Sequence, residues 1–100
     1  MACQIIWSQE SERTFDEIVS FVLSEWSEVA VTSFVTAVDK KLKVLQVFPR
    51  LGRRSLRHPN LYKTNVHKRV TLVYQLKPRK RQIILITFWN NWKKGEGVNY

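Results

Sequence analysis

Two helical patterns follow one another in the first half of the chain, with almost no room between them. One apolar stripe at three- and four-residue spacing consists of Phe15, Ile18, Val19, Val22 and Trp26. The next stripe consists of Val31, Phe34, Val38, Leu42 and Leu45. Residues that recur in this way lie on one face of a helix. Each segment is therefore predicted to be an amphipathic helix.

The sequence also indicates where these helices begin and end. Ser8 and Ser27 stand before the two stripes, and serine is favoured at a helix N-cap because its hydroxyl accepts a backbone N–H. Pro49 ends the second helix, because the residue before a proline avoids the helical region. So short a connection predicts an antiparallel hairpin. The long apolar face of that hairpin must pack on another surface.

Strand patterns supply that surface, one before the hairpin and three after it. The expected strands are residues 4–7 (QIIW), 61–66 (LYKTNV), 70–76 (VTLVYQL) and 82–88 (QIILITF). Alternation in 70–76 is typical of a strand with one buried face. Residues 82–88 are apolar on both faces, which favours a central strand or one that is covered on both sides. The basic segments 50–60 and 77–81 are predicted to be a loop and a turn.

This order predicts one α+β domain over residues 1–100. Its connectivity is β-α-α-β-β-β, with the helical hairpin packed on a mainly antiparallel four-stranded sheet. With 44% apolar residues, the chain has enough for one modest core. In that core we expect Trp26 and Phe34 between the helices and the sheet. Phe88 and Trp89 should face opposite sides of the last strand and both belong to the core.

Composition argues against several other classes of protein. Cys3 is the only cysteine, so an internal disulfide is impossible and a reducing cytoplasm is expected. The first residues lack the features of a signal peptide, and no apolar run approaches the ~20 residues of a membrane span. Two separated histidines and one cysteine make no zinc site, and the three glycines form no phosphate-binding loop. We expect no metal, no cofactor and no membrane partner.

The net charge of +9 is distributed very unevenly. Residues 1–49 hold four basic and seven acidic residues, a net charge of −3, whereas residues 50–100 hold thirteen basic residues and one acidic residue, a net charge of +12. So basic a surface attracts polyanions, either nucleic acid or an acidic protein segment. The predicted binding residues are Arg53, Arg54, Arg57, Lys63, Lys68, Arg69, Asn91, Trp92, Lys93 and Lys94.

The last three of these residues follow a change of pattern. Asn90 and Asn91 favour turns, so the last strand should end there and leave Trp92 at its rim. Lys93 and Lys94 flank that ring with positive charge. An aromatic ring beside cations suits a stacked base or an acidic segment of a partner.

Taken in order, these segments resemble the RelE/ParE superfamily of bacterial type II toxins. Residues 5–11 (IIWSQES) are similar to the first strand and helix start of that family, and residues 22–52 to its second-helix segment. Residues 70–76 look like its "LVYxI" strand, and residues 84–92 (ILITFWNNW) like its last strand. The resemblance covers about the whole chain. It implies a cytoplasmic growth-inhibiting toxin that is held inactive by an acidic antitoxin.

The resemblance implies one of two activities. RelE-like members cut mRNA on the ribosome with basic residues on the sheet and an arginine and a tyrosine near the C-terminus. Such cleavage needs a group to assist removal of the 2′-hydroxyl proton and cations to stabilise the charged phosphorane. Here Lys63 matches the basic strand position, Thr71 stands in place of an arginine, and Asn91 or Trp92 in place of another. No tyrosine follows at the usual distance.

The remaining catalytic candidates are Lys63, Arg69 and His67, and His58 is a further histidine that could act as a general base. ParE-like members instead poison DNA gyrase by binding it, a function that does not require the missing catalytic residues. Binding to gyrase is the favoured hypothesis. The alternatives are a ribosome-dependent mRNA endoribonuclease and a degenerate toxin that retains only antitoxin binding. In each case an acidic antitoxin is expected to bind the basic second half, with charge mainly setting the association rate.

Overall fold

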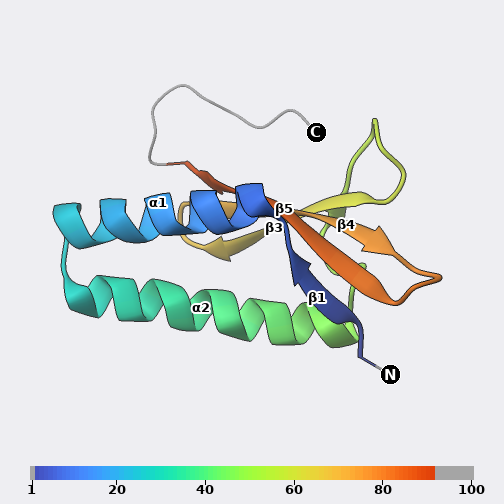
Figure 1. Cartoon of the computed structure of the whole chain (residues 1–100), viewed down its shortest axis with the longest axis horizontal. Coiled ribbons are helices and arrows are strands. Elements are labelled where there is room, and N and C mark those ends of the chain that lie inside the picture. Colours follow the sequence, from blue (N-terminus) through green and yellow to red (C-terminus); the bar gives the residue numbers. More distant parts are fainter. Residues whose placement is uncertain (1, 92–100) are drawn as a thin grey trace.

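The computed structural model describes residues 2–91. Its elements are β1 (Gln4–Trp7), α1 (Gln9–Glu25), α2 (Glu28–Val47), β2 (Arg53–Arg54), β3 (Leu61–His67), β4 (Val70–Lys77) and β5 (Gln82–Asn90). The two helices form an antiparallel hairpin beside one twisted sheet (Figure 1). The predicted α+β architecture is confirmed.

The sheet has the strand order β1-β5-β4-β3-β2, with β1 parallel to β5 and every other pair antiparallel. It contains five strands where the sequence predicts four. The additional strand, β2, is the residue pair Arg53–Arg54, which lies opposite Tyr62 and Lys63. Two exposed arginines inside a basic loop carry no alternation of apolar and polar residues, so the sequence pattern gives no sign of this strand.

Both predicted helix starts are confirmed. The Ser8 side chain accepts a hydrogen bond from the backbone N–H of Ser11, and the Ser27 side chain accepts one from Ala30. The second helix ends at Val47, ahead of Pro49, as expected. Only Trp26 and Ser27 lie between the two helices, which holds them antiparallel.

The core lies between the hairpin and one face of the sheet. Phe34 and Leu45 of α2 are fully buried, and Phe88 of β5 is almost so. The Phe15 ring stacks on the Phe34 ring with their centroids 5.5 Å apart, and it meets the Phe88 ring edge-on, also at 5.5 Å. An aromatic cluster therefore joins both helices to the central strand.

Trp26 does not belong to this core, so the prediction for that residue is wrong. The Trp26 side chain is 53% exposed and packs edge-on against the Phe21 ring, 5.8 Å between centroids. Its backbone has left the helical region, with φ −129° and ψ −93°, because α1 ends at Glu25. The apolar stripe therefore stops at Val22, and the ring of Trp26 turns toward solvent.

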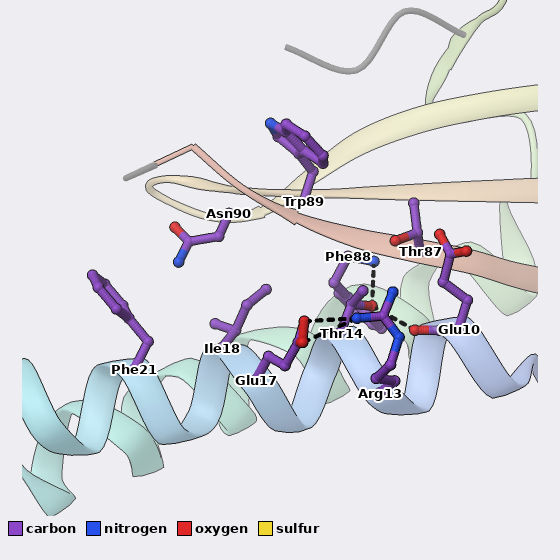
Figure 2. A pocket seen from close by; sticks show the side chains of 10 residues that line it. All are labelled: Glu10, Arg13, Thr14, Glu17, Ile18, Phe21, Thr87, Phe88, Trp89 and Asn90. Atoms are coloured by element: carbon purple, nitrogen blue, oxygen red, sulfur yellow. Dashed lines mark hydrogen bonds and ion pairs between the residues drawn. The ribbon is translucent and has the colours of Figure 1, made fainter. Parts of the chain in front are cut away.

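Beyond β1, helix α1 closes the outer edge of β5. The Ser8 hydroxyl donates to the carbonyl oxygen of Ile86 at 3.1 Å, and the backbone N–H of Phe88 donates to the Thr14 hydroxyl at 3.0 Å (Figure 2). These side chains act where a longer first strand would supply backbone partners. An edge protected in this way resists pairing with another chain.

Candidate functional site

The face of the sheet that looks away from the hairpin carries a groove of about 470 Å³. Its lining residues are Arg53, Lys63, Thr64, Asn65, Thr71, Trp89 and Asn91. They come from β2, β3, β4, the end of β5 and the residue that follows it, Asn91. We call this the open-face groove. Its lining combines two cations, one indole and several hydroxyl and amide groups, and it contains no carboxylate.

Strand register brings these residues together. Asn65 of β3 lies opposite Thr71 of β4, and Thr71 lies opposite Trp89 of β5. Arg53 lies opposite Lys63 at the outer edge. Side chains at directly opposite positions share one face of a sheet. The row of Asn65, Thr71 and Trp89 and the pair of Arg53 and Lys63 therefore form one continuous surface.

An irregularity in β5 sets which ring faces which side. The β4–β5 pairing shifts between Val73 and Tyr74, and the residues beyond the shift alternate again. Phe88 consequently packs toward the helices, whereas Trp89 points away from α1 (Figure 2). The two rings face opposite sides, as expected. The predicted place of Trp89 in the core is wrong, because its side chain is only half-buried and lines the groove.

A network of neutral groups occupies the end of the groove. The Asn91 side-chain amide donates to the Thr71 hydroxyl at 3.0 Å, and that hydroxyl donates to the Asn65 side-chain oxygen at 3.3 Å. Each of these groups is a donor or acceptor without a charge at neutral pH. The network therefore positions polar surface and provides no group that titrates near neutral pH.

Tyr74 anchors the segment that leads into Arg53, residues 49–52, to the sheet. The Tyr74 hydroxyl donates to the carbonyl oxygen of Pro49 at 2.8 Å and accepts the backbone N–H of Gly52 at 3.0 Å. A Cβ atom at Gly52 would lie 2.7 Å from the Tyr74 hydroxyl oxygen and 2.8 Å from the carbonyl oxygen of Lys63. The backbone of Gly52 therefore passes too close to the sheet for any other residue.

Desolvation by burial is the main reason that the pKa of the Tyr74 phenol lies above its ordinary value of 10.0. The neighbouring Tyr62 raises this pKa further, and the hydrogen bond from Gly52 lowers it. The folded protein therefore holds this proton at a pH where the unfolded chain has released it. The resulting stability is fully present below about pH 10 and is lost as the pH rises above that value.

Tyr74→Phe should remove the part of the pH dependence of stability that is due to the Tyr74 phenol. We expect the melting temperature of the original protein to fall more steeply than that of the variant between pH 9 and pH 11. At pH 7 the variant should be less stable by about 1–2 kcal/mol, since the partly buried N–H of Gly52 loses its acceptor. Thermal melts followed by circular dichroism measure both effects. Parallel curves for the two proteins at alkaline pH would contradict the assignment.

The structure divides the predicted binding residues among separate places. Arg53, Lys63 and Asn91 meet in the open-face groove. Arg54 of β2 and Arg57 of the loop after it are both exposed, and the Arg54 guanidinium donates to the carbonyl oxygen of Pro59.

Lys68 and Arg69 line a different hollow. It lies between the β3–β4 turn and the tip of the hairpin, beside Trp26 and Phe34. The predicted rim of Trp92, Lys93 and Lys94 lies outside the described residues.

The catalytic candidates are likewise not brought together. Lys63 lies in the open-face groove. The His67 ring instead packs edge-on against the buried Phe34, 5.8 Å between centroids, and lines the second hollow together with Arg69. His58 lies in the loop before β3, in a third hollow with Leu61 and Gln75. Neither histidine lines the groove that contains Lys63.

Several groove residues were not predicted from the sequence. Trp89, Asn65 and Thr64 are among the lining residues, and strand alternation was the only signal for Trp89 and Asn65, whereas Thr64 lies opposite Leu72 in the row that faces the helices and had none. Once Phe88 is placed toward the helices, alternation requires Trp89 to face the other way.

Two further findings concern the described residues only. Residues 2–91 contain no group of three or more His, Cys, Asp or Glu side chains arranged to hold a metal ion. Neither helix within that range has the length and apolar character needed to cross a membrane.

Comparison with known proteins adds independent information. A family described as "ParE toxin of type II toxin-antitoxin system, parDE" matches residues 5–90. No curated protein sequence matches the chain. The fold is similar to that of several solved structures.

One is the chromosomal ParDE system of P. aeruginosa, with a TM-score of 0.71, 13% identity, and coverage of 89% of this chain and 96% of that one. The intact E. coli RelBE toxin–antitoxin complex gives a TM-score of 0.62 at 19% identity, with 89% and 96% covered. The RelBE2 toxin–antitoxin complex of Mycobacterium tuberculosis gives 0.61 at 13% identity, with 90% and 99% covered. At such identities these likenesses show the fold alone.

Proposed function

Because the chain belongs to the family of ParE toxins of type II toxin–antitoxin systems, we propose that it inhibits growth by binding DNA gyrase and does not cleave RNA. The contact surface in this proposal is the open-face groove with its basic outer edge. An antitoxin is the expected natural antagonist, since similar structures include toxin–antitoxin complexes.

The observation that carries this proposal is the neutral network of Asn91, Thr71 and Asn65. The resemblance to RelE-like toxins leads one to expect arginines at Thr71 and at Asn91 or Trp92, and the side chains of Thr71 and Asn91 are hydrogen-bonded to one another. RNA cleavage needs groups that move protons and cations that stabilise the phosphorane. Within residues 2–91, Arg53 and Lys63 are the cations of the groove, and neither histidine lines it.

The same lining is well suited to holding a protein partner. Trp89 offers a large, rigid apolar surface with one N–H donor, and Arg53 and Lys63 lie near it in the groove. Tryptophan and arginine are the residue types most enriched at the centres of protein interfaces. Opposite charge on the partner would speed association, because basic and acidic patches steer each other during encounter.

Two assays with purified protein test the proposal. In the first, gyrase supercoils relaxed plasmid in the presence of increasing amounts of the protein. In the second, ribosomes translate a defined mRNA, and cleavage is followed by primer extension. We expect supercoiling to be inhibited and the mRNA to stay intact. Cleavage of mRNA in the ribosomal A site with undisturbed supercoiling would refute the proposal.

A charge-matched pair of variants locates the contact. Arg53→Ala with Lys63→Ala should weaken gyrase inhibition by about tenfold or more, because both changes remove cations from the groove. Arg79→Ala with Lys80→Ala removes the same charge from the exposed β4–β5 turn and should change inhibition little. Both proteins should melt near the temperature of the original. Equal losses in the two variants would mean that only net charge matters and that the groove is not the site.

One observation favours the second candidate, a ribosome-dependent endoribonuclease. The half-buried Trp89 ring lies in one groove with Arg53 and Lys63, and a base stacked on such a ring would bring its phosphate near the cations. The ribosome assay above decides between the two candidates. A protein that is inactive in both assays but binds its antitoxin would fit the third alternative, a degenerate toxin that retains only antitoxin binding.

A further inference from the structure

The end of α2 and the loop after it expose a cluster of large apolar side chains. Val44 is 42% exposed, Val47 62%, Phe48 62% and Leu51 53%. We call these four residues the α2-end patch. Residues 47–51 enclose a shallow hollow of about 410 Å³. The open-face groove shares no residue with it.

The last turn of α2 and the turn after it bring these side chains together, with the backbone N–H of Leu51 donating to the carbonyl oxygen of Phe48 at 3.1 Å. Val44 and Val47 are three residues apart in the last turn of α2 and so lie on one face of it, whereas Phe48 and Leu51 follow the helix end and join Val47 around the hollow. The stripe that packs on the sheet is a different one, formed by Phe34, Val38 and Leu45. The helix thus has a second apolar face at its C-terminal end, and no element of residues 2–91 buries it. Contiguous exposed apolar surface of this kind marks an interaction site.

The charges around the patch decide which partner fits it. Lys40 is exposed four residues before the patch, and Arg50 is exposed within it and lines the hollow. Lys43 pairs with Asp39, the acidic residue nearest to the patch in the sequence, at 3.0 Å. A second copy of the chain would bring these cations against their own counterparts, in a molecule of net charge +9. An acidic partner meets opposite charge instead.

We propose that the α2-end patch binds an acidic amphipathic segment of the antitoxin, separately from the groove that contacts the cellular target. This inference rests on the toxin role but not on the choice of gyrase as the target. Apolar side chains of the segment cover Val47 and Phe48, and its carboxylates face Lys40 and Arg50. Apolar burial supplies most of the affinity, and the flanking charges raise the association rate.

The test uses the purified full-length protein and the purified antitoxin encoded by the reading frame beside its gene. Isothermal titration compares Val47→Ser with Phe48→Ser against a matched control, Leu23→Ser with Val29→Ser. The control side chains are 50% and 79% exposed and lie near the hairpin turn, at the other end of α2. We expect the patch variant to bind about tenfold or more weakly and the control to bind as before. Leu51→Ser alone should show a smaller loss and serves if the double variant fails to fold.

Growth assays give the complementary result. The patch variant should still inhibit growth but should no longer be neutralised by a level of antitoxin that neutralises the original protein. Unchanged antitoxin affinity, or an equal loss in the control, would overturn the proposal. So would a dimer in sedimentation velocity that the patch variant abolishes, because the patch would then bind a second copy. Lost growth inhibition with full antitoxin affinity would assign the patch to the cellular target. A failure of the gyrase assay leaves the titration result intact.

Discussion

Replacing Phe34 by alanine will lower the free energy of unfolding by about 3–5 kcal/mol, which is much of the stability of a small domain. The Phe34 side chain has no exposed surface, and its ring contacts the rings of Phe15 and His67. Its loss opens a cavity where both helices meet the sheet. Urea unfolding followed by circular dichroism measures the change.

Trp26→Ala is the informative control for that experiment, because both residues belong to the apolar pattern of the hairpin. The Trp26 side chain is 53% exposed, so its removal should cost about 1 kcal/mol or less. If the two variants lose equal stability, Trp26 is packed in the core and the end of α1 differs from the structure described.

Gly52→Ala should have the second largest effect, a loss of about 1–3 kcal/mol from overpacking. The added methyl group would meet the carbonyl oxygen of Lys63 at 2.8 Å, and backbone of β3 cannot move aside without disturbing the sheet. The loop should therefore lift away from Tyr74 and carry Arg53 out of the groove. Unfolding midpoints in urea and gyrase inhibition should fall together in this variant.

A double-mutant cycle with Tyr74→Phe separates the two close contacts of Gly52. Removing the hydroxyl relieves the contact at 2.7 Å but leaves the one to Lys63. The double variant should therefore remain less stable than Tyr74→Phe alone. Equal stability of the double variant and Tyr74→Phe would show that the hydroxyl is the whole obstacle.

Most of the fold could be predicted because its determinants are local. Ser8, Ser27 and Pro49 set the helix ends through hydrogen bonds and steric effects within a few residues. The apolar character of residues 82–88 on both faces correctly indicated a central strand, and β5 lies between β1 and β4. Such signals survive folding because tertiary contacts reinforce them.

What could not be predicted depends on geometry that the sequence pattern does not contain. Trp26 fits the apolar spacing of α1, yet the helix ends one residue earlier and the ring follows the turn. Trp89 was assigned to the core because tryptophan is large and apolar, but register places it opposite Thr71 on the other face. Charge alone grouped Lys68 and Arg69 with Lys63, and only the topology shows that they serve different surfaces.

The hydroxyl contacts from Ser8 and Thr14 to β5 have a consequence for how this protein is made. They join positions 78 and 74 residues apart, and β1 pairs with the same distant strand. During synthesis at about 5–20 residues per second, α1 therefore waits several seconds for the strand it packs on. Until residues 82–90 emerge, α1 lacks the strand on which it packs and the Phe15 ring lacks its contact with Phe88, although β3 can already reach α2. The contacts that join α1 to the sheet therefore form only after β5 has been synthesised, which makes them late events in the folding of the chain.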